Sequence, residues 1–469
     1  MRKKNVVLEN VPVTAYAAEG KALARVDGKV IFIEGGVVPG DVVDVRLSKN
    51  KKDWAEGKAT QIHTYSPDRV TPFCDHFGLC GGCKWQMLPY ERQLAYKQQQ
   101  VEDHLRRIGH LQFPALPPIL GAAKTRHYRN KLEFTFSNKA YLTDEEIREA
   151  GEDWPRRNAL GFHIPKLFDK VLDIQTCYLQ EEPANLIKNT IRDWAEKHQL
   201  SFYDIRRQEG WLRNLVLRIC TTGEVMVNLV IHHEAKEQRE ALLNHLLATV
   251  PGITTLLYTI NPKKNDSIFD LEPKVFFGKG YVEEKLEDFT FKIGPKSFFQ
   301  TNTYQGEALY KVTRDFAGLT GKETVYDLYC GTGSIGIFVS RSAGKVVGIE
   351  LIKEAIDDAR ENAAANKVEN ATFFAGDVID ICDDAFFAEH GAPDVIITDP
   401  PRAGMHEKLT AKLLEVAAPR IVYVSCNPAT QARDLALLNE KYSVEKVQAV
   451  DMFPHTHHIE NVVLLQRRY

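Results

Sequence analysis

Residues 327–336 read DLYCGTGSIG. This stretch joins an apolar run that ends at Leu328 to a second apolar run that starts at residue 335. The first run reads as a strand and the second as the start of a helix, so Gly331, Gly333 and Gly336 form G-x-G-x-x-G at a strand-to-helix turn. Glycines at such a turn let the backbone bend tightly and approach a ligand closely. Glu350 ends the next predicted strand, where a carboxylate can accept both ribose hydroxyls of a nucleotide. The motif predicts a nucleotide-type cofactor, and NAD and S-adenosylmethionine fit it equally well.

Six short apolar segments predict the sheet around this turn. Most are separated by helix-length stretches, and they read TVYDLY (324–329), KVVGIE (345–350), ATFFAG (371–376), DVIITD (394–399), RIVYVS (420–425) and NVVLLQ (461–466). This alternation is typical of a doubly wound, mostly parallel α/β sheet.

The fourth of these strands distinguishes between the two cofactors. Asp399-Pro400-Pro401 follow it at the carboxyl end of a strand, where ligands bind in open α/β sheets. A D-P-P turn at this place is typical of S-adenosylmethionine-dependent methyltransferases and not of dehydrogenases. Many enzymes that methylate amino groups have an aromatic residue next, but here the residue is Arg402. The pattern favours S-adenosylmethionine and argues against an amino-group target.

Cys426 follows the fifth strand and is expected at the same edge of the sheet. Pyrimidine C5 is scarcely nucleophilic, but a thiolate that adds to C6 makes C5 enolate-like, so that C5 can attack a methyl sulfonium. Cysteine suits this task because appreciable thiolate forms near neutral pH. Release then needs a base for the C5 proton, and Glu460 precedes the final strand. We interpret the neighbouring histidines as structural or substrate-orienting, and not as metal ligands: His455, His457 and His458.

The front of the chain is organised differently. Short strands with turn signals between them suggest a small barrel of the oligonucleotide-binding type, and they read VTAYAA (13–18), ALARVD (22–27), KVIFIE (29–34), DVVDVRLS (41–48) and KATQIH (58–63). Residues 90–109 have helical apolar spacing and stop at Gly109. From residue 127 to about 280 the pattern is mixed α+β.

Composition and charge set limits on function. The chain has 469 residues, of which 44% are hydrophobic and 26% charged, and it has no apolar run of about 18 residues, so we expect a globular protein without a membrane span. Its first residues do not read as a signal peptide, and we expect a cytoplasmic protein. Residues 1–140 contain 22 Lys and Arg against 14 Asp and Glu, whereas the whole chain has a net charge of −3. A basic front half hints at a polyanionic partner.

Three of the eight cysteines form C-x5-C-x2-C at Cys74, Cys80 and Cys83. Three thiolates need a fourth ligand to hold either zinc or an iron–sulfur cluster, and the spacing does not separate the two. The remaining five are scattered, and a secreted disulfide scaffold is therefore a poor explanation.

Taken together, these motifs resemble those of the RNA uracil-C5 methyltransferase family. The segments that carry the resemblance are SFFQTN (297–302), DLYCGTGSIG (327–336), TDPPRAG (398–404), VSCNP (424–428) and FPHTHHIENVVLL (453–465). With the barrel, which resembles a TRAM domain, and the cysteine loop, the resemblance runs nearly end to end and is greatest to the 23S rRNA (uracil-C5) methyltransferases. It implies that Cys426 is the nucleophile and Glu460 the general base. It also implies an S-adenosylmethionine site made of Gln300, Tyr329, Gly331, Glu350, Asp377 and Asp399.

The same resemblance implies a fourth cysteine ligand, Cys177, and a [4Fe–4S] cluster in place of zinc. The cluster would shape the RNA-binding surface, since uracil methylation transfers no electrons. The target uracil must leave its stack so that the thiolate can reach C6 from the ring face. Candidate contacts to flipped or single-stranded RNA are Arg126, Tyr128, Arg129 and Lys131, together with Arg402.

The sequence therefore predicts three domains: a TRAM barrel at 1–64, a central α+β domain with the cysteine-ligated cluster at 65–280, and a class I methyltransferase domain at 281–469. The predicted substrate is a uracil in 23S rRNA, with tRNA as the alternative, and no protein partner is implied. A second alternative is an RNA-binding iron–sulfur protein without activity, which the presence of both Cys426 and Glu460 disfavours. The sequence identifies neither the modified uracil nor the oligomeric state.

Overall fold

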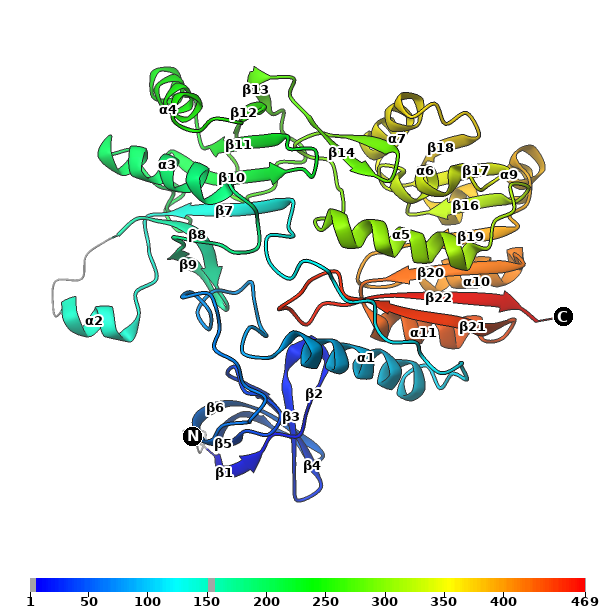
Figure 1. The fold of residues 1–469 in the computed structure, drawn as a ribbon, viewed down its shortest axis with the longest axis horizontal. Helices are drawn as coiled ribbons and strands as arrows, with labels where there is room; N and C mark the ends of the chain where they lie inside the picture. Colours follow the sequence, from blue (N-terminus) through cyan, green and yellow to red (C-terminus); the bar gives the residue numbers. More distant parts are fainter. Residues whose placement is uncertain (1–5, 151–156, 469) are drawn as a thin grey trace.

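The computed structural model describes residues 6–150 and 157–468 (Figure 1). Three large sheets, a two-stranded hairpin and a long helix, α1, organise the described residues, with the barrel at the lower end of the view, the central sheet at upper left and the third large sheet at right. None of the described helices combines the length and hydropathy needed to cross a bilayer.

Six strands form the barrel, in the order β1-β5-β6-β4-β3-β2. Their bounds are β1 Val7–Pro12, β2 Ala15–Tyr16, β3 Ala22–Val26, β4 Lys29–Glu34, β5 Val42–Asn50 and β6 Trp54–Thr64, with the short 3-10 turn η1 at Ala18–Gly20. Asp27 and Gly28 both have positive φ, which is the geometry of the tight turn that joins two antiparallel strands. Alternate side chains such as Val43 and Val45 fill the interior, so the predicted barrel is confirmed.

The central domain has a seven-stranded sheet in the order β13-β12-β11-β10-β7-β8-β9. Its strands are β7 Lys131–Ser137, β8 Ala159–Ile164, β9 Leu167–Asp173, β10 Leu212–Ile219, β11 Val225–Ile231, β12 Thr255–Ile260 and β13 Lys274–Gly278. Its helices are α2 Asp144–Ala150, α3 Ala184–Lys197 and α4 Lys236–Thr249. Apolar residues of α3 and α4 share one core with the inner strands, so this part has the expected α+β character.

A hairpin of β14 (Val282–Leu286) and β15 (Phe289–Ile293) leads through residues 294–302 into α5 (Thr303–Ala317) and the third sheet. This sheet has the order β18-β17-β16-β19-β20-β22-β21. Its strands are β16 Thr324–Leu328, β17 Lys345–Glu350, β18 Ala371–Ala375, β19 Val395–Thr398, β20 Arg420–Ser425, β21 Tyr442–Val450 and β22 Glu460–Arg467. Its helices are α6 Ser334–Ser340, α7 Lys353–Ala365, α8 Val378–Ile381, α9 Asp384–His390, α10 Glu407–Val416 and α11 Pro428–Leu438.

Both faces of this sheet are covered, because successive side chains of a strand point to opposite sides. In β16, Val325 packs with residues of α6 and α7, whereas Tyr326 packs with residues of α10 and α11. All six predicted strands are present, and the first five are parallel. β22 runs antiparallel to β20, and β21, which the sequence analysis did not identify, pairs with β22 at the sheet edge.

Helix α1 (Tyr90–Arg107) begins and ends close to where the sequence predicts a helix, but it lies against the third sheet (Figure 1). Val101 and Leu105 are fully buried in the core that α10, α11 and the sheet share. Within the expected central range, 65–280, α1 therefore packs on the third sheet, whereas residues 131–278 build the central sheet.

Candidate active site

The glycine-rich turn follows β16 and leads into α6. Gly331 and Gly333 both have positive φ, and a Cβ at Gly333 would lie 2.9 Å from Ala359 Cβ. The backbone there can bend and pack closely only because a side chain is missing. Tyr329 also has positive φ, at 61°, which is uncommon for a bulky residue and marks a held conformation. The turn thus leaves open backbone at the carboxyl end of β16.

Two carboxyl groups hold this turn in place. Glu350, at the end of β17, accepts the N–H of Gly331 at 3.2 Å and the N–H of Ile352 at 3.0 Å. Asp327 is buried and accepts the N–H of Gly336 at 2.8 Å. Burial raises the pKa of Asp327 to about 8, and the nearby carboxyl groups of Asp399 and Glu350 add to the shift.

The other residues predicted to bind the cofactor lie around the same edge. Asp377 follows β18 and caps α8 by accepting the N–H of Ile379 at 2.9 Å. It is close enough to Tyr329 to help raise the tyrosine's pKa, although burial is the larger cause. Gln300 lies before α5, where its carbonyl accepts the side-chain amide of Asn130 at 2.8 Å. The predicted set is thus brought together by consecutive strand ends and one loop.

Cys426 and Glu460 come from neighbouring strands. Ser425 pairs with Asn461 across the antiparallel β20–β22 ladder, so the residue after β20 lies beside the first residue of β22. Burial raises the pKa of Cys426 to about 11, and the carboxyl groups of Glu460 and Asp399 contribute in the same direction. The nearby guanidinium of Arg402 opposes this rise in the pKa.

Asp399 and Glu460 are two neighbouring acids near the sulfur of Cys426. Burial raises the pKa of Asp399 to about 7. Glu460 is 5% exposed, and its pKa is raised well above the usual range by burial and by Asp399, against the opposing charge of Arg402. Two neighbouring carboxyl groups, one buried and one half-buried, cannot both be ionised at low cost, so the pair holds a proton near neutral pH. A carboxylate freed of that proton is a strong base for its type.

The basic segment 126–131 is only partly available to a ligand. Arg126 is exposed, with its guanidinium 3.7 Å from the centre of the Phe73 ring. Arg129 and Lys131 are half-buried. Tyr128 is 2% exposed and donates its hydroxyl to the Pro454 carbonyl, so this tyrosine has no surface to offer RNA and that expectation is wrong.

The four predicted cysteine ligands line one cavity of about 810 Å³: Cys74, Cys80, Cys83 and Cys177. Burial raises the pKa of Cys83 to about 11 and that of Cys177 to about 12, and in both cases the neighbouring cysteines add to the rise. Across residues 6–150 and 157–468, no three His, Cys, Asp or Glu side chains converge on a single metal position. Arg129, Thr456 and His458 also line this cavity, which places it directly beside the catalytic edge.

Residues 451–458, which lead into Glu460, are fixed by contacts that the sequence analysis missed. Lys97 and Asp451 form a fully buried ion pair at 2.6 Å. Gln93 donates to His455 Nδ1 at 3.1 Å and accepts the His455 N–H at 2.8 Å. A signal was present, since Gln93 and Lys97 lie on the same helical stripe as Val101 and Leu105 and are therefore polar residues on an apolar face.

The barrel also contacts this segment. Gly20 has positive φ, and a Cβ there would lie 2.9 Å from His457 Cβ. The N–H groups of Lys84 and Trp85, directly after Cys83, donate to the His455 carbonyl at 2.8 and 3.0 Å. The segment that precedes Glu460 is therefore held by the barrel, the cysteine loop and α1 together.

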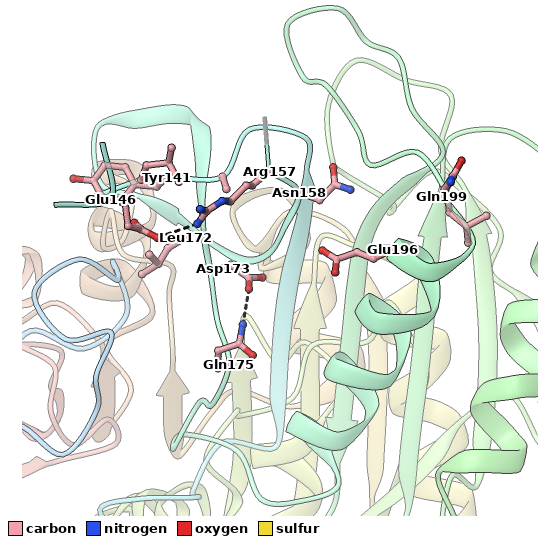
Figure 2. Close-up of a pocket in the computed structure, with 12 residues that line it drawn as sticks. Tyr141, Glu146, Arg157, Asn158, Leu172, Asp173, Gln175, Glu196 and Gln199 are labelled. Atoms are coloured by element: carbon pink, nitrogen blue, oxygen red, sulfur yellow. Dashed lines mark hydrogen bonds and ion pairs between the residues drawn. The ribbon is translucent and has the colours of Figure 1, made fainter. Parts of the chain in front are cut away.

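A second hollow, of about 760 Å³, lies in the central domain among β9, α3 and the loop before α2 (Figure 2). Two pairs of its polar side chains interact, Arg157 with Glu146 at 3.4 Å and Gln175 with Asp173 at 2.6 Å. It contains none of the residues that the motifs identify.

Comparison with known families agrees with this geometry. A family model described as tRNA (Uracil-5-)-methyltransferase matches residues 205–468, which include the glycine-rich turn, Asp399, Cys426 and Glu460. The chain belongs to this family. A TRAM domain model matches residues 7–60, so the interpretation of the barrel is confirmed.

Relatives of this methyltransferase extend over its whole length. A Bacteroides thetaiotaomicron protein is 56% identical over 455 residues, covering 96% of this chain and 100% of its own. A Porphyromonas gingivalis protein is 51% identical over 461 residues, covering 97% of this chain and 99% of its own. Both are described as uncharacterized RNA methyltransferases.

A solved structure is similar throughout. It is that of Pyrococcus abyssi tRNA (uracil-54, C5)-methyltransferase in complex with S-adenosyl-L-homocysteine, with a TM-score of 0.72, 27% identity and coverage of 97% of this chain and 99% of that one. The chain is thus an RNA methyltransferase of the uracil-5 family that uses S-adenosylmethionine, and the predicted family, activity and methyl donor are confirmed.

Proposed function

We propose that this enzyme methylates C5 of a uracil in 23S rRNA through a covalent adduct between Cys426 and C6. The observation that carries the proposal is the juxtaposition of Cys426 and Glu460 on adjacent antiparallel strands, at the edge where the glycine-rich turn opens. The 23S rRNA assignment is supported by the resemblance of the motif set, barrel and cysteine loop to that branch. The Pyrococcus abyssi neighbour, a tRNA (uracil-54, C5)-methyltransferase, keeps tRNA as the alternative.

The chemistry follows from the positions of the two residues. The Cys426 thiolate adds to C6, and the electron pair of the C5–C6 double bond makes C5 nucleophilic. Bound S-adenosylmethionine would supply the methyl group from its sulfonium, so that C5 gains a methyl group and S-adenosylhomocysteine is released. Glu460 then takes the C5 proton, the double bond re-forms and the thiolate leaves, which yields 5-methyluracil and free Cys426. The raised pKa of Glu460 suits this step, because a more basic carboxylate removes a carbon-bound proton more readily.

For the methyl donor, we propose the six residues that the motifs identify. Glu350 would accept the ribose hydroxyls while Asp377 lies near the adenine, since each follows a strand beside the glycine-rich turn. Asp399, Gln300 and Tyr329 would surround the methionine part. Gly331 supports this arrangement because no atom lies within 4 Å of the place where its Cβ would be, so the backbone is open to a ligand.

We also propose that the four cysteines hold a [4Fe–4S] cluster. The donor set fits, because four thiols surround one cavity. The alternative is zinc, which four thiolates can also hold. The cluster would hold the cysteine loop, and through Lys84 and Trp85 that loop holds the segment before Glu460.

For RNA, we propose contacts from exposed Arg126 and Arg402 and from the half-buried Arg129 and Lys131. Arg129 lines the cavity of the cysteines, and Arg402 contacts His458, which also lines it, so phosphates and unstacked bases could meet these cations there.

The test separates the two catalytic residues. Cys426→Ala abolishes both methylation and adduct formation, because no other group activates C5. Glu460→Gln still adds and transfers the methyl group but cannot release the product, so a methylated RNA–protein adduct accumulates on denaturing gels. Cys382→Ala, which removes a buried thiol at the end of α8, serves as the matched control and keeps its activity. An adduct formed by Cys426→Ala would refute the nucleophile, and free turnover by Glu460→Gln would refute the base.

The substrate is tested separately. Mapping 5-methyluridine in both rRNA and tRNA of a strain without the gene should show loss of the modification from 23S rRNA. Loss from tRNA alone would establish the alternative.

A further inference from the structure

Arg402 is held at the catalytic edge by several contacts. Its carbonyl accepts the side-chain amide of Asn427 at 3.0 Å and the hydroxyl of Thr430 at 3.2 Å. Both partners belong to the start of α11, directly after Cys426. The backbone of Arg402 is therefore fixed relative to the cysteine, but its long exposed side chain is not fixed by these contacts alone.

His458 supplies the contact at the other end of that side chain. Nη2 of Arg402 lies 3.2 Å from Nδ1 of His458. A guanidinium can only donate hydrogen bonds, so Nδ1 must accept, and the imidazole is neutral with its proton on Nε2. The pKa of His458 is lowered to about 3 by burial and by nearby His457, Arg402, Lys97 and Arg129, which is consistent with a permanently neutral acceptor.

We propose that His458 is a positioning residue that fixes the Arg402 guanidinium against the sulfur of Cys426, so that Arg402 stabilises the thiolate. The inference rests on the proposed nucleophilic role of Cys426. It gives Arg402 a catalytic task in addition to the predicted contact with RNA.

The charges around the sulfur show why such a cation is needed. Glu460 from β22 and Asp399 after β19 both oppose a negative sulfur, and among the described residues Arg402 is the cation that acts against them. Burial and the two acids hold the pKa of the thiol at about 11 even with Arg402 in place, so loss of the guanidinium would lower the thiolate fraction further. When the S–H proton is lost to water, the guanidinium donates to the resulting thiolate, and this charge-assisted bond requires the side chain to stay in place.

The test measures the thiolate directly and needs neither RNA nor methyl donor. The rate of iodoacetamide alkylation of Cys426 is followed against pH by mass spectrometry of the peptide that contains it. Since only the thiolate reacts, the rate near pH 7.5 falls about tenfold for each unit by which the thiol pKa rises. We expect Arg402→Met to slow alkylation about tenfold or more and to move the profile to higher pH.

His458→Ala should slow alkylation about three- to tenfold, because the guanidinium is then free to move away. His458→Asn should restore the wild-type profile, since its side-chain oxygen can accept the same hydrogen bond. Lys408→Met, which removes an exposed cation six residues from Arg402, is the matched control and should leave the profile unchanged. In methylation assays His458→Ala should lower kcat and leave the KM for S-adenosylmethionine unchanged.

Wild-type alkylation profiles for both His458→Ala and Arg402→Met would overturn the inference. So would an equal loss in His458→Asn and His458→Ala, with melting temperatures at the wild-type value, because the loss would then have no connection to the hydrogen bond. A failure of the proposed function gives a different result: Cys426→Ala would remain active while the alkylation profiles of the other variants stayed as expected.

Discussion

Glu350→Gln offers a sharp test of the cofactor site, because it removes one charge and keeps the shape of the side chain. In the free enzyme the two oxygens of Glu350 accept from Gly331 and Ile352, so the carboxylate is already oriented toward the glycine-rich turn. Glutamine retains one acceptor oxygen and turns the other into a donor. The substitution therefore costs the enzyme one charge-assisted hydrogen bond to a ribose hydroxyl.

Such a bond contributes about 1.5–3 kcal/mol, which corresponds to an affinity about 10- to 150-fold weaker. Isothermal titration with S-adenosylhomocysteine measures this directly, because the product analogue binds without reacting. Glu354→Gln, at an exposed position in the first turn of α7, makes the same charge change and should leave the Kd unchanged.

An unchanged Kd for Glu350→Gln would remove this residue from the cofactor site. An equal loss in both variants would attribute the effect to net charge. Melting curves of the free proteins complete the comparison, because Glu350 also anchors backbone. A weaker Kd with a wild-type melting temperature assigns the loss to the cofactor.

Three further predictions concern buried groups. Between about pH 6 and 8, the free energy of unfolding of Asp327→Asn should rise relative to that of the wild type by up to about 1.4 kcal/mol per pH unit, as measured by urea unfolding. The reason is that the raised pKa of Asp327 gives the wild type stability that is present at low pH and lost as pH rises toward 8. Lys97→Met should lower the free energy of unfolding by about 3–5 kcal/mol, because it leaves the buried carboxylate of Asp451 without its cation. Adding Asp451→Asn should recover part of this loss, and an unchanged stability of the single variant would contradict the reasoning. Anaerobically purified enzyme should contain about four irons, and Cys177→Ala should lose them; elemental analysis that finds one zinc and no iron would refute the cluster.

Much of the active site could be predicted because parallel strands impose its geometry. When strands run parallel, the residues that follow them meet at one edge, so Tyr329, Glu350, Asp377, Asp399 and Cys426 could be placed together before the structure was known. Glu460 follows the same logic from the other direction, since it begins the antiparallel strand beside β20.

The edge strand β21 escaped prediction for a local reason. Its register shifts between Val444 and Lys446, and this bulge breaks the alternation of apolar and polar residues. Val444 and Val447 are both buried although three positions separate them, so the period of two on which the prediction relies is absent.

The contacts that fix residues 451–458 could not be predicted either, and the reason is different. Gln93 and Lys97 are visible as polar residues on an apolar helix face, but their partners are more than 350 positions away in the chain. Nothing in the sequence near Lys97 indicates that Asp451 is its ion-pair partner. The role of the barrel turn at Gly20 is hidden in the same way, because the glycine is explained only by the presence of His457.

The separation of 354 residues between Lys97 and Asp451 has a consequence for how the protein is made. At about 5–20 residues per second on the ribosome, roughly 20–70 s pass between synthesis of the helix and synthesis of its counterion. Throughout that interval the ammonium of Lys97 has no carboxylate to join, and the apolar stripe of α1 has no sheet to cover. The helix therefore docks after translation has passed residue 451, and a methyltransferase domain expressed from residue 281 onward would lack both the cation and the apolar cover that α1 provides.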